Sequence, residues 1–349
     1  KKKHKSLGLS NDQLADMYAQ MYLQRRFEER AMQQYQKGKF GGFLHLYIGQ
    51  EAVSTGTVFA LQNNDDIITA YRDHGWGLCR GISAKSGMAE LFGKATGCSK
   101  GKGGSMHFAN VREHFWGGYG IVGGHIPIAS GLAFANKYQA NGRISTCFFG
   151  DGAVDQGSLH ETLNLAQLWK LPAIFVVENN GYSMGTAESR HSAGEPLARR
   201  GDCFDVNWSV HQGHDLYEVR GAIEDALARA RTDCSPSVLE IVTYRYRGHS
   251  VADPDQTYRS KEEIEEYKKN KDPINLFRDK LLAEGLMTDE DAKALDQSAK
   301  DEAEASAEFA LASPFPDTSE LMDDVYWETD NPEHKTSSGK LFFESSLSD

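Results

Sequence analysis

The hydrophobic positions at the start of the chain have helical spacing. Ser10 precedes them, and Gln13 stands three residues later, which is the spacing of a capping box. Gly38 stands where such a helix would end. The apolar positions that recur behind Ser10 are Leu14, Met17, Tyr18 and Met21. We therefore expect a long helix to open the chain.

The middle of the chain alternates short apolar runs with amphipathic stretches. The apolar runs predict buried strands at 66–70, 144–149, 173–178 and 238–244. The amphipathic stretches predict helices at 127–140, 156–169 and 216–231. Near-continuous apolar strands that alternate with helices predict an α/β fold, with a parallel sheet that is covered by helices on both faces.

The strand pattern stops at about residue 260. Segments rich in Glu, Asp, Lys and Ala then predict a helical C-terminal part, with helices at 260–270, 273–284 and 288–312. The tail after Pro314 has little periodicity, and we expect it to be extended or partly ordered by a partner. We predict one domain in four segments, which are a helical arm (1–45), an α/β core (46–260), C-terminal helices (261–315) and an extended tail (316–349).

Charge and composition exclude several classes of function. The formal net charge of −12 disfavours nucleic acid as a partner. No apolar run approaches the roughly 20 residues that cross a membrane, so we expect no membrane partner. The five cysteines lack the spacing of a metal or redox pair, which favours a reducing compartment. Residues 1–10 do not resemble a transit peptide, so we expect a bacterial cytoplasmic protein, although a processed mitochondrial matrix or plastid chain would look the same.

Polar or glycine-rich segments follow all four predicted strands. Parallel α/β sheets bind their ligands at the carboxyl ends of the strands, so these segments are the first place to look for chemistry. They lie at 71–75, 150–152, 179–182 and 245–250.

Gly-Asp-Gly at 150–152 and Asn-Asn at 179–180 form the most informative pair. The 26 residues between them hold one predicted helix and one predicted strand, so the two flanking strands should be parallel. Asp151 and Asn180 would then offer oxygen ligands that suit Mg²⁺, which usually completes its shell with phosphates and water. Gly152 and Ala153 would let backbone N–H groups approach a diphosphate. Either motif alone would more simply be a turn, but the pair favours a binding site.

This pair resembles the signature of thiamin-diphosphate enzymes. The surrounding sequence resembles the alpha subunits of 2-oxo acid dehydrogenases, and within that family the subunits of enzymes that act on pyruvate. The resemblance covers about residues 10 to 315. The matching stretches are 41–52, 71–75, 102–107, 118–123, 178–182 and 244–250.

The resemblance implies a role for each matching position. It implies a thiamin-diphosphate-binding fold with thiamin diphosphate and Mg²⁺ as cofactors. The metal would be held by Asp151, Asn180 and the backbone carbonyl of Tyr182. The diphosphate would be bound by Tyr71, Arg72 and Arg245, and the aminopyrimidine half by backbone groups of Gly120 and Val122. The substrate and the reactive carbon of the cofactor would lie near His45 and His249, with Phe43 in the same wall.

Each of these side chains also has a plainer interpretation. Arg72 and Arg245 would otherwise be surface salt-bridge partners, although positions at strand ends and bidentate phosphate geometry favour binding. His45 and His249 would otherwise be structural histidines, and only the resemblance favours a site. His74, His107 and His125 receive no role, and Phe43 would otherwise be part of the core.

The second half of a thiamin site is missing from the chain. Thiamin catalysis needs a carboxylate on the aminopyrimidine ring, and the helical segments after 260 leave no room for the second α/β domain that would carry it. The resemblance implies an α2β2 assembly with this glutamate on a beta subunit. The expected reaction is decarboxylation of the small 2-oxo acid pyruvate, followed by reductive acetylation of a lipoyl group on the acyltransferase core of the complex.

Three other interpretations compete with this one. The first is an alpha subunit of an acetoin or branched-chain 2-oxo acid dehydrogenase, because those subunits share the Asp and Asn motifs. The second is an NAD-dependent Rossmann dehydrogenase, because Gly118-x-Gly120-x-x-Gly123 matches the dinucleotide fingerprint. We expect it to fail, because 113–116 predicts a poor strand and Pro127 falls where the helix should continue. The third is a scaffold subunit without chemistry, which would not need Asp151.

Overall fold

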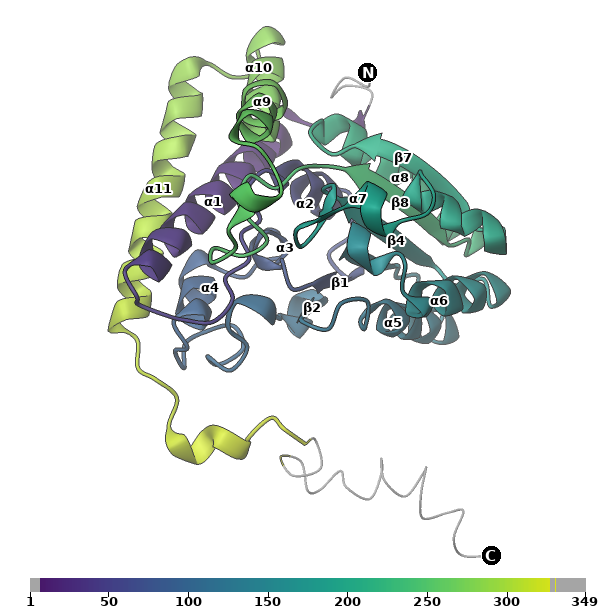
Figure 1. Cartoon of the computed structure of the whole chain (residues 1–349), viewed down its shortest axis with the longest axis horizontal. Helices are drawn as coiled ribbons and strands as arrows, with labels where there is room; N and C mark the ends of the chain where they lie inside the picture. Colours follow the sequence, from purple (N-terminus) through teal and green to yellow (C-terminus); the bar gives the residue numbers. More distant parts are fainter. Residues whose placement is uncertain (1–6, 327–329, 331–349) are drawn as a thin grey trace, which may run out of the picture.

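The computed structural model, which describes residues 7–326 and Asp330, is built around a parallel sheet (Figure 1). The sheet has six strands in the order β2-β1-β3-β4-β8-β7, and every neighbouring pair is parallel. The strands are β1 (Asp66–Ala70), β2 (Phe115–Tyr119), β3 (Ser145–Gly150), β4 (Ala173–Asn179), β7 (Asn207–Gln212) and β8 (Ser237–Val242). The predicted α/β class with a parallel sheet is confirmed.

The four predicted strands are β1, β3, β4 and β8, and the prediction missed both edge strands. β3 and β4 are adjacent and joined through α6 (Gly157–Leu168), as the spacing of the two motifs predicted. β2 was missed because two of its five residues are glycines, and β7 because its polar side chains are partly exposed. A short antiparallel hairpin of β5 (Tyr182–Ser183) and β6 (Thr186–Ala187) was also missed.

Alternate side chains of the central strands enter two separate cores. Phe148 and Val176 pack into one core, and their neighbours Phe149 and Val177 pack into the other. This two-sided burial explains why these strands read as continuous apolar runs. α5 (Ile126–Tyr138) and α6 cover one face of the sheet, while α2 (Glu51–Val58) and α8 (Leu216–Asp233) contribute to the core on the other face.

The first helix and the last helix lie side by side (Figure 1). α1 (Asn11–Gln36) begins at the predicted Ser10–Gln13 capping box, and α11 (Asp289–Ala312) runs along it. α9 (Lys261–Lys271) and α10 (Pro273–Ala283) complete the predicted helical C-terminal part. Our division of the chain into four segments stays a prediction. No helix in the described residues is long and apolar enough to cross a membrane.

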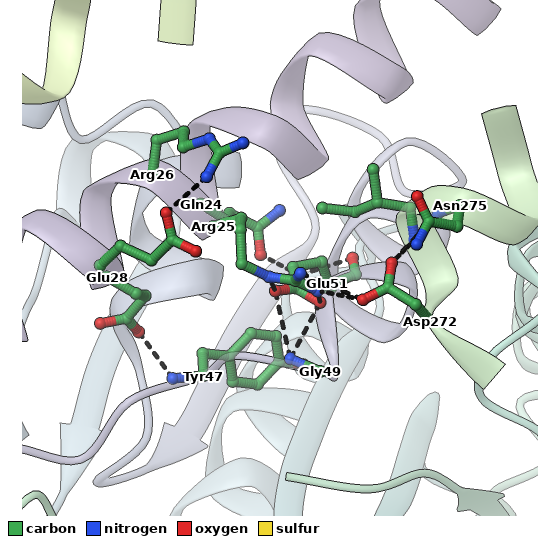
Figure 2. Close-up of polar contacts among 12 residues, drawn as sticks. Gln24, Arg25, Arg26, Glu28, Tyr47, Gly49, Glu51, Asp272 and Asn275 are labelled. Atoms are coloured by element: carbon green, nitrogen blue, oxygen red, sulfur yellow. Dashed lines mark hydrogen bonds and ion pairs between the residues drawn. The ribbon is translucent and has the colours of Figure 1, made fainter. Parts of the chain in front are cut away.

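A buried ion cluster ties α1 to the rest of the molecule (Figure 2). Arg25 of α1 lies 2.5 Å from the carboxylate of Glu51 and 3.1 Å from that of Asp272. Glu51 also accepts from the backbone N–H of Gly49, at 3.0 and 3.1 Å. The cluster therefore joins α1, the start of α2 and the N-cap of α10 in one contact.

The structure corrects both reasons that we gave against the dinucleotide fingerprint. A strand, β2, does precede Gly120, and Pro127 stands in the first turn of α5, where proline is tolerated. However, β2 is an edge strand, and Gly118 lies inside it, where an added Cβ would collide with the carboxylate of Asp73. These glycines are therefore explained by close packing of β2 and by the turn that follows it at the edge of the sheet.

The chain past α11 contacts the loop at 94–102, where Ala95 N donates to the carbonyl of Pro314 at 3.0 Å and Lys100 lies 2.9 Å from the carboxylate of Asp324. A short 3-10 turn forms at Thr318–Met322 within the segment that we predicted to be an extended tail. The rest of that predicted tail, at 327–329 and 331–349, lies outside the described residues.

Candidate active site

One cavity of about 520 Å³ opens at the carboxyl ends of β1, β3 and β4. Every residue to which the sequence analysis assigned a role lines it, from segments far apart along the chain. These residues are Phe43, His45, Tyr71, Arg72, Gly120, Val122, Asp151, Gly152, Ala153, Asn180, Tyr182, Arg245 and His249. The structure thus brings the predicted set together on one surface.

The two asparagines after β4 have different surroundings. The amide of Asn179 is occupied, because its Nδ2 donates to Glu188 and Glu240 and its Oδ1 accepts from Gly181 N. Asn180 Nδ2 donates to Gln50 Oε1 at 3.2 Å, which orients the amide, and its Oδ1 has one long contact of 3.4 Å from Tyr182 N. Asn180 is therefore the asparagine with an oxygen available to a cation.

Asp151 begins the 3-10 turn Asp151–Ala153 directly after β3, and its side chain is buried. Burial raises the pKa of this carboxyl, although a hydrogen bond from His191 lowers it. His191 Nε2 lies 3.2 Å from Asp151 Oδ2, and its Nδ1 lies 3.0 Å from Asp155 Oδ2. His191 belongs to the short helix α7 (Glu188–His191), and nothing in the sequence indicated this contact.

Arg72 and Arg245 bring positive charge to the cavity. Arg72 donates to the carbonyls of Leu46 (2.6 Å) and His249 (2.9 Å). Burial lowers the pKa of Arg72, and the positive charge of the nearby Arg245 lowers it further. Arg245 donates to the carbonyl oxygens of Met184 and Arg247. Neither guanidinium has a salt bridge to an Asp or Glu within residues 7–326. Two buried cations without acidic partners fit a diphosphate, so this wall suits the group that the resemblance implies.

Three rings line the cavity beside Arg72. The ring centroids of His45 and Tyr71 are 4.6 Å apart, those of His45 and His249 are 5.0 Å apart, and those of Tyr71 and His249 are 5.4 Å apart. Burial and then Arg72 lower the pKa of His45 to about 2 and that of His249 to about 4. Both imidazoles are therefore neutral at physiological pH, and each can donate a hydrogen bond at one ring nitrogen and accept one at the other. Phe43 is 66% exposed, so it is not core.

Glycine is needed at position 152 for a reason that the sequence analysis did not anticipate. A Cβ added to Gly152 would collide with Ser183 Oγ, so the residue must be small because β5 approaches it. The second glycine of the Gly-Asp-Gly motif is therefore also required by the packing of a neighbouring hairpin. Whether its backbone N–H groups approach phosphate, as we predicted, stays a prediction.

His125 is a further cavity residue to which the sequence analysis gave no role. Its side chain is fully buried, and Nε2 lies 2.8 Å from the carbonyl oxygen of Phe148. Because a carbonyl only accepts, Nε2 carries the proton, and Nδ1 is left as an acceptor without a partner in the described residues. Burial lowers the pKa of His125 to about 4, so the ring is neutral.

The described residues hold no cluster of three or more His, Cys, Asp or Glu side chains that could bind a metal ion. The predicted magnesium set is of a different kind, because it has one carboxylate, one amide and one backbone carbonyl. Such a set suits a hard cation that shares its shell with phosphate oxygens and water.

The fold, the cavity and the sequence together define the class of protein. The family model for the dehydrogenase E1 component matches residues 19–319, and the chain belongs to this family. Members of this family use thiamin diphosphate.

Similar proteins of known name indicate a particular subunit within this family. A protein of Rhizobium meliloti called pyruvate dehydrogenase E1 component subunit alpha is 47% identical over 308 residues, which is 88% of each chain. A protein of the same name from Zymomonas mobilis is 46% identical over 90% of this chain and 88% of its own. The mitochondrial subunit alpha of Dictyostelium discoideum is 43% identical over 91% of this chain and 83% of its own. The relatives thus come from bacteria and from a mitochondrion.

Proposed function

We propose that this chain is the alpha subunit of the decarboxylating component of a pyruvate dehydrogenase complex. It would bind the diphosphate end of thiamin diphosphate and Mg²⁺ for the oxidative decarboxylation of pyruvate and the reductive acetylation of lipoyl groups. The observation that carries the proposal is the single cavity that gathers every residue implied by the resemblance. The relatives that share 43–47% of its sequence carry the corresponding name.

The polar wall of the cavity would hold the charged end of the cofactor. Asp151, Asn180 and the carbonyl of Tyr182 would bind Mg²⁺, and Tyr71, Arg72 and Arg245 would bind the diphosphate. This assignment is supported by the amide oxygen of Asn180, which has only one long contact, and by the two guanidinium groups that lack acidic partners. The contact between His191 and Asp151 uses only Oδ2 of the carboxylate, so the other carboxylate oxygen would be available to the metal.

The aromatic wall would face the reacting end. When bound, thiamin diphosphate supplies a carbon nucleophile and an electron sink for decarboxylation. Gly120 and Val122 would contact the aminopyrimidine half through their backbone groups. His45 and His249 would hydrogen bond to the substrate as neutral imidazoles, because their low pKa values keep them unprotonated at working pH. Neutral rings also avoid placing further positive charge beside Arg72.

The proposed beta-subunit partner would cover the outer face of α5 and α6. Large apolar side chains are exposed there, and the ring of Phe134 stacks on that of Tyr138 with centroids 6.4 Å apart. An exposed apolar surface of this kind supports the proposal of a protein interface. The exposed members are Ile128, Phe134, Tyr138, Leu165, Leu168 and Trp169. A beta subunit seated here would complete an α2β2 assembly and supply the activating glutamate, and the assembly would serve the lipoyl-bearing acyltransferase core in a bacterial cytoplasm.

The metal role of Asp151 is tested by cofactor binding rather than by activity. Thiamin diphosphate is titrated into the assembled α and β subunits, with Mg²⁺ and with EDTA, and the dissociation constant is measured. Asp151→Asn should abolish the Mg²⁺-dependent gain in affinity. Asp155→Asn is the matched control, because Asp155 also contacts His191 but does not line the cavity. Equal effects of the two substitutions would contradict the proposed metal site.

A further inference from the structure

A chain of hydrogen bonds runs from α1 to the cavity wall. Glu28 Oε2 lies 3.0 Å from His74 Nδ1, and His74 Nε2 lies 3.0 Å from both the carbonyl oxygen and the hydroxyl oxygen of Ser105. The backbone N–H of His45 donates to the same hydroxyl at 3.3 Å. Of these four residues, only His45 lines the cavity.

Glu28 and His74 form a fully buried charged pair. The side chain of His74 is 0% exposed and that of Glu28 is 1% exposed. The imidazole lies against Phe108, with ring centroids 4.8 Å apart, and against the edge of Phe27. Burial alone would lower the pKa of His74, but the facing carboxylate of Glu28 outweighs it and the pKa is raised. A pair without access to water persists only because its hydrogen bonds are satisfied.

The order Glu–His–Ser resembles a nucleophilic triad, but the chemistry of this cluster is different. A triad needs a ring nitrogen with a free lone pair to accept the serine proton. Here Nδ1 faces a carboxylate and Nε2 faces the carbonyl oxygen of Ser105, and both of these groups only accept. Both ring nitrogens therefore carry protons, and His74 cannot act as a base toward Ser105. The cluster holds structure in place and does not activate a nucleophile.

The Glu28–His74–Ser105 cluster holds in place the irregular segment that carries His45. Residues 43–47 belong to no helix or strand, so their backbone groups need partners from elsewhere. Glu28 Oε1 accepts from Tyr47 N at 2.7 Å (Figure 2), and Ser105 accepts from His45 N. Arg72 donates to the carbonyl of Leu46, which lies between these two positions. The Glu28–His74–Ser105 cluster thus fixes the segment on both sides of Leu46.

We propose that Glu28, His74 and Ser105 are positioning residues that set the His45 imidazole against the reacting end of the cavity. This inference rests on the proposed function, because it gives His45 a part in the reaction. It predicts that the contribution of Ser105 to catalysis is made through His45 alone. A residue that merely stabilised the fold would contribute whether or not His45 were present.

A double-mutant cycle on the assembled α and β subunits tests this dependence. Ser105→Ala, His45→Ala and the double variant are compared for kcat and KM with pyruvate, for thiamin diphosphate affinity and for thermal stability. Ser105→Ala should lower kcat by roughly 5- to 100-fold, the range expected when a buried donor loses its acceptor. Cofactor affinity should change by less than about twofold, and in the His45→Ala background the same substitution should have no further effect on kcat.

A control and a second variant complete the experiment. Ser99→Ala removes a serine in the same loop whose Oγ donates to the carbonyl of His107 at 2.8 Å, and it should leave kcat unchanged. Glu28→Gln keeps an acceptor for Tyr47 N but removes the charge that faces His74, and it should repeat the loss of kcat that depends on His45.

The outcomes separate the inference from the function on which it rests. Equal losses from Ser105→Ala in both backgrounds would overturn the positioning role while leaving the role of His45 intact. Full activity of His45→Ala would overturn the proposed role of His45, and the positioning inference with it. Cofactor binding by that variant would still measure the diphosphate site independently.

Discussion

Two buried arginines offer a matched test of the diphosphate site. Arg72 and Arg80 are 7% and 6% exposed, both donate to backbone carbonyls, and burial lowers the pKa of each. Only Arg72 lines the cavity. Replacing each arginine with methionine removes the charge while keeping much of the apolar stem, so the pair separates binding from folding.

The structure sets the expected magnitudes. Removing one member of a buried charge pair weakens binding by about 2–5 kcal/mol, so Arg72→Met should raise the dissociation constant of thiamin diphosphate roughly 30- to 4,000-fold. Arg80 donates to the carbonyls of Glu113, Gln62, Asn63 and Asp65, whereas Arg72 donates to two carbonyls. Each abandoned carbonyl costs about 1–3 kcal/mol, so Arg80→Met should destabilise the fold more than Arg72→Met does.

The assay uses the assembled α and β subunits. Cofactor affinity is measured by isothermal titration calorimetry, and stability by the melting temperature without cofactor. Weak binding by Arg72→Met and normal binding by Arg80→Met are expected, with the opposite order in loss of stability. Unchanged affinity in Arg72→Met, or equal losses of affinity in both variants, would refute the assignment of Arg72 to the diphosphate.

Three further predictions follow from burial and charge. Arg25→Met should destabilise the chain by about 3–5 kcal/mol in urea unfolding, because it leaves the carboxylate of Glu51 buried without its partner, and adding Glu51→Met should recover part of the loss. Burial lowers the pKa of His125 and His214 to about 4, below the value near 6.5 in the unfolded chain. The stability that comes from keeping these rings neutral should therefore be fully present above pH 6.5 and be lost as the pH falls towards 4. The loss should be at most about 3 kcal/mol per histidine. Unfolding curves at pH 7 and pH 5 check the sign, and a smaller difference is expected in His214→Gln. Phe134→Asp should prevent co-purification with a beta subunit while leaving the circular dichroism of the chain unchanged, and normal co-purification would argue against the proposed interface.

The sequence predicted the central sheet because both faces of that sheet are buried. β3 and β4 read as apolar runs for this reason, and the groups that follow them, Asp151 and Asn180, were found from the strand ends. β7 lies at the edge with partly exposed polar residues, so it gave no such signal. The roles at His45 and His249 came only from resemblance, since a lone histidine carries no pattern of its own.

Contacts between distant segments explain what the sequence could not predict. His191 meets Asp151 across 40 positions of the chain, and it does so from a short helix, α7, that follows β4 and that no hydrophobic periodicity announced. Glu28 and His74 look like a solvent-facing acid and an ordinary loop histidine until the fold buries both. Their pairing depends on how α1 packs against the segment after β1, which is a property of the tertiary structure rather than of any local motif.

The most direct test of the account is the activity of the chain with a cognate beta subunit. The two subunits are co-expressed, and reduction of an artificial electron acceptor is measured with pyruvate, acetoin and branched-chain 2-oxo acids, each with and without thiamin diphosphate and Mg²⁺. The account predicts activity with pyruvate that requires both cofactors. A preference for acetoin or a branched-chain acid would overturn the substrate, and activity that does not depend on the cofactors would contradict the proposed site around Asp151 and Asn180.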